Sequence, residues 1–429
     1  MEKPVIRISV RNLVEFILRN GDLESGGTAG DKEAMLKGIR LHRKIQKQMG
    51  SHYQAEVSLK KDTEYEDLIL RVEGRADGIF TQNEKICIDE IKGVYKNLEL
   101  LAEPVLVHRA QALCYAWIYL DDHGLEEIDV QMTYAHLDTE MIKRFRETMT
   151  REELESWYQR LLDSYHKWLS YQMKWREERN RSMEKLEFPF TYRKGQKEMV
   201  AGIYHAISRK EQIFIQAPTG VGKTMSAVFP AVRSIGEGKA ETLFYLTART
   251  ITRTVAQDAF EILRKNGLLF KTVTITAKEK LCFCEKPECN PETCPYAKGH
   301  YDRINDAVYE LWTNEQSFDR ETILRQAEKW QVCPFEMSLE LSVWMDAVIC
   351  DYNYVFDPNV YLKRFFGENI SGKYLFLIDE AHNLVERGRE MYSASICLED
   401  TIQIRKFIKP YSQKLWKMLG KVVSQLKEL

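Results

Sequence analysis

Two acidic residues and a lysine lie close together in the N-terminal third of the sequence. Asp77 ends one apolar, alternating segment, and Glu90 and Lys92 end the next, which predicts two strands joined by a turn. Residues two apart on a strand share a face, so Glu90 and Lys92 can meet Asp77 across this hairpin. Asp89 adjoins Glu90, but the spacing to the lysine favours Glu90. Two carboxylates bind a hard divalent cation, and the lysine can orient or deprotonate a water that attacks a phosphodiester.

This group resembles the signature of the PD-(D/E)xK nucleases. His42 is similar to the extra upstream histidine of their RecB-like branch, and Gln111-Ala-Leu-Cys-Tyr115 resembles that branch's Gln-x-x-x-Tyr motif, on a helix expected over about 104–120. The resemblance implies a mixed sheet flanked by helices over residues 1–140. It further implies that Gln111 and Tyr115 contact DNA or support the site.

The same resemblance implies a role for each residue at the centre. Lys92 would be catalytic. Mg²⁺ or Mn²⁺ would be held by the side chains of His42, Asp77 and Glu90 with the Ile91 carbonyl.

A short glycine-bearing loop follows an apolar segment, predicted as a strand over 212–217, and precedes a predicted helix. This is the P-loop layout, in which backbone N–H groups and a helix N-terminus converge on phosphate oxygens. Lys223 is expected to meet the β- and γ-phosphates, and Thr224 the Mg²⁺. The expected ATP-binding residues of the loop are Ala217, Pro218, Thr219, Gly220, Val221, Gly222, Lys223 and Thr224.

An apolar run over 373–378 ends in Asp379-Glu-Ala-His382. Such a run is typical of a strand buried in a parallel sheet, whose carboxyl edge binds ligands. We expect Asp379 to hold Mg²⁺ through water and Glu380 to polarise the attacking water. His382 would couple the nucleotide to the DNA side.

Five of the nine cysteines lie between Cys282 and Cys333. In a chain without an export signal, this clustering favours a metal or cluster site over disulfides. Four thiolates can hold zinc or a 4Fe–4S cluster, and spacing alone does not decide between them.

The order of these motifs resembles the XPD/DinG family of iron–sulfur superfamily 2 helicases. The likeness rests on the P-loop, a cysteine-bearing insert, Cys333-Pro, Asp351-Tyr-Asn-Tyr354 and Asp379-Glu-Ala-His. It implies a RecA-like P-loop NTPase domain over 186–395 with an iron–sulfur insertion over 276–345. It also implies the start of a helical Arch domain over 396–429.

The helicase resemblance assigns further residues. Arg193 and Gln196 would lie beside the adenine, and Thr247 and Arg249 would contact the DNA backbone. The 4Fe–4S ligands would be Cys282, Cys289, Cys294 and Cys333, with Cys284 as a spare that could exchange with Cys282.

Composition sets wider limits. The formal net charge of −2 gives no general nucleic-acid footprint, and any basic groove must be local. No run of eighteen apolar residues predicts a membrane span, and no secretory signal opens the chain, so we expect a cytoplasmic protein. Residues 141–185 are predicted as a helical linker whose aromatic residues pack on the nuclease sheet. No Gln-x-x-Gly-Arg-x-x-Arg stretch occurs, so we expect a chain truncated before a second motor domain.

These observations predict an α/β protein that combines two activities. The resemblances imply a 5′→3′ ATP-dependent DNA helicase fused to a metal-dependent DNA nuclease, acting on single-stranded and forked DNA in repair or processing. One alternative is an ATP-responsive iron–sulfur DNA-binding module that does not unwind. Another is a stand-alone nuclease with a vestigial motor. The oligomeric state stays open.

Overall fold

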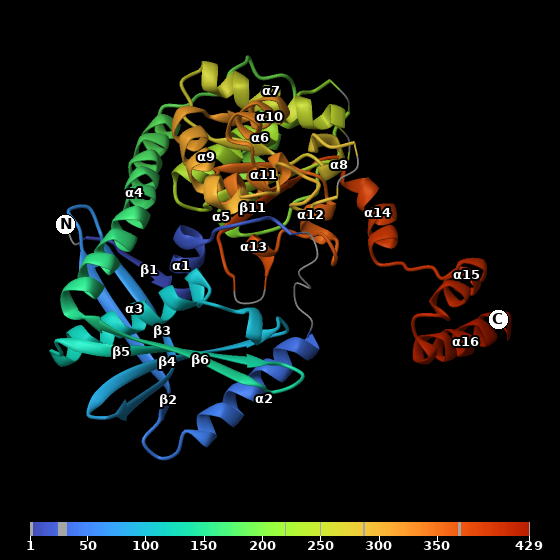
Figure 1. The fold of residues 1–429 in the computed structure, drawn as a ribbon. Coiled ribbons are helices and arrows are strands. Elements are labelled where there is room, and N and C mark those ends of the chain that lie inside the picture. Colours follow the sequence, from blue (N-terminus) through green and yellow to red (C-terminus); the bar gives the residue numbers. More distant parts are fainter. Residues whose placement is uncertain are drawn as a thin grey trace. The chain divides into compact units, whose positions relative to one another are not determined.

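The computed structural model describes residues 3–24, 32–218, 220–248, 250–285, 288–367 and 370–428 (Figure 1). The chain divides into two compact units. The first contains Met1–Thr191, Val232–Gly238 and Ile262–Val348, and the second contains Tyr192–Ala231, Lys239–Glu261 and Ile349–Leu429. The segment that carries the clustered cysteines therefore belongs to the same unit as the predicted nuclease region.

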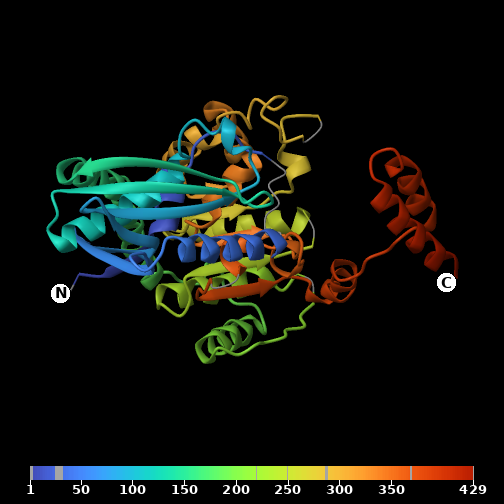
Figure 2. The same cartoon turned by 60° about the horizontal axis from the view of Figure 1, so that its bottom comes forward.

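A six-stranded mixed sheet forms the centre of the N-terminal region (Figure 2). Its main order is β1-β3-β4-β5-β6, and β2 pairs with β3. The pairs β1/β3 and β4/β5 are parallel, and the other three pairs are antiparallel. The strands are β1 (Val5–Ser9), β2 (Gln54–Glu64), β3 (Ile69–Gln82), β4 (Lys85–Val94), β5 (Glu127–His136) and β6 (Ile142–Thr150).

Helices cover both faces of this sheet. Successive side chains of β4 point to opposite sides, so this strand packs against helices on both faces. Ile88 packs in the core with α3, whereas Ile91 packs with Leu41 and Ile45 of α2. Both faces of β4 are therefore buried. The helices of this region are α1 (Val10–Leu18), α2 (Lys32–Gln48), η1 (Leu98–Leu100), α3 (Leu106–His123) and α4 (Arg151–Glu184).

The predicted linker differs from the observed structure at its start. The polar stretch after Asp138 was expected to be helical, but 142–150 forms β6 and extends the sheet. Its polar residues alternate with partly buried ones, which is the period of a strand and not of a helix. The helix begins only at Arg151, after a capping box made by Thr150 and Glu153. Tyr158 of α4 is buried in the core of the first sheet, as predicted, whereas Trp168 is buried against Trp312.

The second half of α4 packs against the cysteine-bearing segment of the same unit. Trp168 stacks on Trp312 with 5.6 Å between ring centroids, and Arg179 donates to Asp346 at 2.5 Å. Lys271 is buried and donates to two carbonyl oxygens at the C-terminal end of α9, both at 2.6 Å. The segment contains β8 (Thr272–Thr274), α8 (Lys278–Leu281), α9 (His300–Asn314), β9 (Ser317–Phe318), α10 (Arg320–Trp330) and α11 (Pro334–Ser342).

A second, five-stranded sheet has the order β11-β7-β10-β8-β9, with β11/β7 and β8/β9 parallel. The strands new to this sheet are β7 (Thr242–Leu246), β10 (Ala347–Cys350) and β11 (Tyr374–Ile378). The helices of this part of the chain are α5 (Gln196–Arg209), α6 (Lys223–Gly236), α7 (Thr250–Lys265), α12 (Asn353–Phe356), α13 (Lys363–Phe366), η2 (Ala381–Asn383), α14 (Leu384–Met391), α15 (Leu398–Ile408) and α16 (Gln413–Glu428).

The strand predicted over 212–217 is not formed. These residues are described but take no strand structure, and the side chain of Phe214 is 88% exposed. A strand gains its stability from cross-strand partners, and this segment pairs with none of the described strands, so its apolar character alone was a misleading signal. The helix that follows does begin at Lys223, as predicted.

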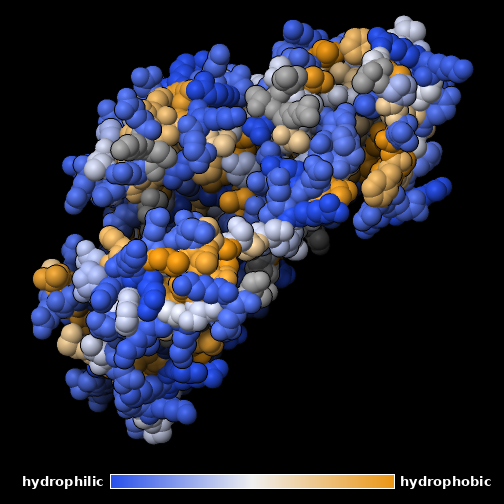
Figure 3. Space-filling model, turned by 90° about the vertical axis from the view of Figure 1, so that its right-hand side faces the viewer, coloured by the Kyte–Doolittle hydropathy of each residue, from blue (hydrophilic) through white to orange (hydrophobic). Residues whose placement is uncertain are grey.

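The surface seen in Figure 3 is mostly hydrophilic, with scattered hydrophobic patches. Among the described residues, no helix combines the length and apolar character needed to cross a bilayer.

Candidate functional site

The predicted carboxylates meet where strands β3 and β4 of the first sheet separate, a place that we call the fork. Pairing between β3 and β4 runs from Gln82↔Lys85 to Gly78↔Asp89. Beyond that point the next contact between the strands is made by a side chain, because Oδ2 of Asp77 accepts from the backbone N–H of Ile91 at 2.7 Å. Asp77 is thereby fixed at the fork.

Glu90 lies on β4 beside this fork and is almost completely buried, at 4% exposure. Its Oε1 accepts from Nζ of Lys92 at 2.7 Å, while its Oε2 is buried without a hydrogen-bond partner among the described residues. Burial, together with the nearby Asp77 carboxylate, raises the pKa of Glu90 to about 7 against the opposing effect of Lys92. A buried carboxylate oxygen without a partner is costly, and a cation would satisfy it.

Lys92 links β4 to helix α3. Its ammonium also donates to Oε1 of Gln111 at 2.7 Å. Gln111 and Tyr115 are both buried, and the Tyr115 hydroxyl lies so close to Gly74 that a Cβ there would be 2.7 Å away. Their positions fit the supporting role that the resemblance offered as one of two possibilities.

Helix α2 contributes two further side chains that lie beside Asp77. Nδ1 of His42 lies 3.7 Å from Oδ1 of Asp77, and Gln46 donates from Nε2 to the Asp77 carbonyl at 3.0 Å. Gln46 was not predicted, although its spacing of four residues from His42 places both on one helix face. The structure therefore brings together all six residues that the nuclease resemblance selected.

Asp89 points to the opposite face of β4. It is fully buried and accepts hydrogen bonds from Tyr53, Gln131 and Thr133 at 3.0, 3.1 and 2.6 Å. Burial raises the pKa of this carboxyl. Its donors are all supplied by the protein, so Asp89 is a structural group and Glu90 is the acid available at the fork.

The nucleotide loop of the second unit is held by the two residues predicted to flank an adenine. The Arg193 guanidinium donates to the Gly220 carbonyl, and Nε2 of Gln196 donates to the Val221 carbonyl at 2.6 Å. Gly222 has a φ of 79°, and a Cβ there would lie 2.5 Å from the Gln196 amide nitrogen. The loop therefore requires glycine at this position. Thr219 lies outside the described residues.

Lys223 stands between the loop and the acidic pair. Its Nζ donates to the Ala217 carbonyl at 3.2 Å and lies 3.6 Å from Oε1 of Glu380. Burial and the neighbouring Glu380 raise the pKa of Asp379. A lysine next to two carboxylates can bind phosphate oxygens and a divalent cation.

Two tyrosines support the acids and were not predicted. The Tyr352 hydroxyl donates to the Asp379 carbonyl and, at 3.1 Å, to the Glu380 carbonyl. The Tyr245 hydroxyl interacts with the side chains of Asp379 and Thr224. Tyr352 belongs to the Asp-Tyr-Asn-Tyr stretch, which directly follows β10. This position in the sequence was the signal that could have indicated its role beside the acids.

Thr247, one of the expected nucleic-acid contacts, follows Leu246, whose carbonyl accepts from the backbone N–H of Asp379. Thr247 is 1% exposed and its hydroxyl pairs with that of Thr252, so in this conformation it does not present a hydroxyl to a backbone phosphate. His382 is exposed, with Nδ1 3.4 Å from Oε2 of Glu380. Arg249 lies outside the described residues.

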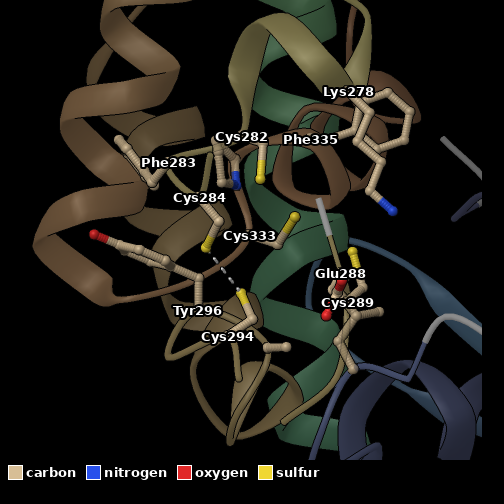
Figure 4. Close-up of a pocket in the computed structure, with 13 residues that line it drawn as sticks. Lys278, Cys282, Phe283, Cys284, Glu288, Cys289, Cys294, Tyr296, Cys333 and Phe335 are labelled. Atoms are coloured by element: carbon tan, nitrogen blue, oxygen red, sulfur yellow. Dashed lines mark hydrogen bonds between the residues drawn. The ribbon is translucent and has the colours of Figure 1, made fainter. Parts of the chain in front are cut away.

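The five clustered cysteines line one pocket (Figure 4). The sulfurs of Cys282, Cys284, Cys294 and Cys333 point toward the space between them, and Sγ of Cys284 lies 3.8 Å from Sγ of Cys294. Burial raises the pKa of Cys333 to about 11, and burial with the neighbouring Cys294 thiol raises that of Cys284 to about 11. Cys289 also lines the pocket, and its sulfur interacts with the Lys278 ammonium.

The resemblances imply a divalent cation at the fork and an iron–sulfur cluster in the cysteine pocket. In the part of the chain that the structure describes, no three His, Cys, Asp or Glu donors already stand at coordinating distance of one point. At the fork, the unpartnered Glu90 oxygen and the adjacent Asp77 fit a hard divalent cation. In the pocket, the five thiols that line it are soft donors and fit a soft metal or an iron–sulfur cluster.

The loop, the lysine and the acidic pair define a P-loop nucleotide-binding site. Residues 193–288 match the DEAD/DEAH box helicase family model, and residues 265–401 match the DEAD_2 family model. This region of the chain is therefore supported as a helicase-type ATP-binding region of superfamily 2.

The chain is also similar to curated proteins, one of which is a helicase by name. The Regulator of telomere elongation helicase 1 homolog of Caenorhabditis briggsae is 23% identical over 51% of this chain and 27% of that protein. The Fanconi anemia group J protein homolog of Gallus gallus is 32% identical over 24% of this chain and 8% of that protein. The chain thus spans about a quarter, or less, of the length of these relatives.

Among solved structures, one described as XPD_Helicase has a TM-score of 0.36 at 20% identity, covering 56% of this chain and 41% of that one. Another, described as Truncated XPD, has a TM-score of 0.34 at 22% identity, covering 55% and 65%.

Proposed function

We propose that this chain couples a metal-dependent DNA nuclease centre to the ATP-binding motor region of an XPD/DinG-type DNA helicase that acts in DNA repair or processing. The observation that carries the nuclease proposal is the fork between β3 and β4. There a buried carboxylate with an unpartnered oxygen, a second carboxylate, a lysine and a histidine converge. The family matches over 193–401 support the motor proposal.

In the nuclease centre, Asp77, Glu90 and His42 would hold Mg²⁺ or Mn²⁺. When bound, the cation would stabilise the extra negative charge that develops on a phosphodiester under attack. Lys92 would orient the attacking water through its ammonium, which lies beside Glu90, and would take a proton from that water only as the neutral amine. The hydrogen bond from Lys92 to Gln111 would keep the ammonium directed at the scissile position, while Gln46 would hold the backbone of Asp77.

In the motor region, the loop amides and Lys223 would bind the ATP phosphates. Asp379 would hold the Mg²⁺ through water, and Glu380 would polarise the attacking water. The contacts from Tyr352 to the carbonyls of both acids would fix their backbone. Single-stranded DNA is the proposed track, with forked DNA as the proposed substrate.

For the cysteine pocket we propose a 4Fe–4S cluster, with Cys282, Cys289, Cys294 and Cys333 as ligands and zinc as the competing occupant. The pocket supplies enough soft donors for either. Iron, sulfide and zinc measured in anaerobically purified protein distinguish the two. A colourless protein that holds only zinc would overturn the cluster.

The nuclease and motor roles can be separated with three variants of the whole chain. Labelled single-stranded DNA is incubated with Mn²⁺, and ATP binding is measured in parallel with a fluorescent analogue. Glu90→Ala should abolish cleavage but keep ATP binding, and Lys223→Ala should do the reverse. Asp89→Asn is the matched control, since it changes the adjacent carboxylate on the other face of β4 and should retain cleavage.

Two results would contradict the proposal. Cleavage that persists undiminished in Glu90→Ala would place the nuclease elsewhere or in a contaminant. Loss of cleavage in Lys223→Ala would mean that the two centres are not independent.

A further inference from the structure

The cysteine pocket is built partly from sequence that belongs to the predicted nuclease region. Leu23 lines the pocket together with Cys294 and Cys333, and these residues form one small hydrophobic cluster with Ala297. Leu23 is 8% exposed. Its position in the chain lies more than 250 residues before the first cysteine of the cluster, and both segments belong to the same compact unit.

Four hydrogen bonds fix the backbone of this N-terminal segment beside the pocket. The Leu23 N–H donates to the Ala297 carbonyl at 2.8 Å, and the Tyr301 N–H donates to the Gly21 carbonyl at 2.9 Å. The other two are reciprocal and involve aspartates. Gly21 N–H donates to Oδ1 of Asp302 at 2.8 Å, and Gly299 N–H donates to Oδ1 of Asp22 at 2.6 Å.

The same segment contacts two helices of the cysteine-bearing segment through Arg19. The guanidinium lies 4.2 Å from the centre of the Tyr301 ring and donates to Oε1 of Glu340 at 2.8 Å. Tyr301 is on α9, which follows Cys294, and Glu340 is on α11, which follows Cys333. Arg19 therefore joins the two helices that carry the chain away from two proposed ligands.

One further contact ties these two arms together. The backbone N–H of Cys333 donates to Nδ1 of His300 at 3.1 Å, and His300 is the first residue of α9 and is fully buried. The arm that bears Cys333 is thus attached to α9 directly, and to the N-terminal segment through Arg19.

We propose that segment 19–23 is a wall of the cysteine pocket, which shields the thiols or their bound metal from solvent and holds the arms of Cys294 and Cys333 together. In this arrangement the sequence of the nuclease region is a structural part of the metal site. The inference rests on the proposed metal-bearing role of the pocket, but the shielding of the thiols can be tested without metal.

The test uses the whole chain with Leu23→Ala. Its matched control is Leu186→Ala, which truncates an equally buried leucine that does not line the pocket. The first measurement is the rate at which metal leaves anaerobically purified protein after a chelator is added. The second is the rate at which N-ethylmaleimide modifies Cys294 and Cys333 in metal-free protein, read by mass spectrometry.

We expect both rates to rise about tenfold in Leu23→Ala, because truncating a buried leucine makes local opening easier, and to stay near the wild-type values in Leu186→Ala. Asp22→Ala, which removes one of the reciprocal hydrogen bonds, should act in the same direction. If the rates in Leu23→Ala equal those of wild type and control, segment 19–23 does not shield the thiols and the proposal is wrong.

Failure of the proposed cofactor gives a different result. Wild-type protein that binds no metal, or Cys333→Ser protein that binds as much as wild type, contradicts the metal site. The modification rates of the thiols then still decide whether segment 19–23 shields them.

Discussion

Replacing Glu90 with glutamine should make the metal-free chain more stable at alkaline pH. Glu90 has a pKa of about 7 in the folded chain, against an ordinary value of 4.5. The folded state therefore binds more protons than the unfolded state between these values, and the free energy of unfolding falls as pH rises through this window. A pKa shift of this size lowers the free energy of unfolding by about 3 kcal/mol relative to low pH, and the full loss is reached above pH 7. Glutamine keeps the shape and carries no charge.

The assay is urea unfolding at pH 5, 6, 7 and 8 in the presence of a chelator. Hydrogen exchange of peptides from β3 and β4 identifies the transition of the first unit. The stability difference between Glu90→Gln and wild type should increase with pH by up to about 3 kcal/mol. Added Mn²⁺ at pH 8 should then stabilise wild type more than the variant, because the cation offsets the charge that glutamine lacks.

The control is Glu99→Gln, at an exposed position on η1, which should show no such pH dependence. The reasoning is refuted if the difference between Glu90→Gln and wild type at pH 8 stays within about 0.5 kcal/mol of its value at pH 5. That outcome would mean that Glu90 is charged and solvated at the fork without cost.

Three further predictions follow from the contacts described above. Gly222→Ala should weaken ATP-analogue binding at least about tenfold, because the new Cβ would meet the Gln196 amide and the residue would keep a left-handed φ; unchanged affinity would show that the loop relaxes freely. Cys289→Ser should lower the metal content more than Cys284→Ser, since Cys289 is a proposed ligand and Cys284 is the spare beside Cys294; metal analysis showing an equal or larger loss in Cys284→Ser would contradict this ligand set. Lys271→Met should lower the free energy of unfolding by about 1–3 kcal/mol, because the carbonyl oxygens of Trp312 and Glu315 at the C-terminal end of α9 lose their donor; urea denaturation that finds a more stable variant would contradict this.

The nuclease-like group was predictable because its members are joined by local structure. Asp77 and Glu90 lie on two strands of one hairpin, and Glu90 and Lys92 share a face through the period of two. Gln111 followed from the resemblance of Gln111-Ala-Leu-Cys-Tyr115 to the Gln-x-x-x-Tyr motif. Each of these relations spans few residues, so the spacing in the sequence carries them.

Other features depend on long-range packing and left little local signal. Leu23 is one apolar residue in a loop, and only the folded chain places it against Cys294 and Cys333. The segment over 212–217 is as apolar as a buried strand, yet it pairs with no described strand. For β6, the charged residues suggested an exposed helix, whereas the sheet used them as one solvent-facing side of a strand.

The composition of the first unit has a consequence for how the chain is made. The first of its three segments ends at Thr191. The second begins at Val232, and the third begins at Ile262 and ends at Val348. A ribosome that adds about 5–20 residues per second needs roughly 10–30 s to pass from the first of these points to the last. During that interval Phe16, which later lies 5.6 Å from Trp344, has no ring to pack against there. Part of the packing of the N-terminal region therefore depends on residues that are synthesised late.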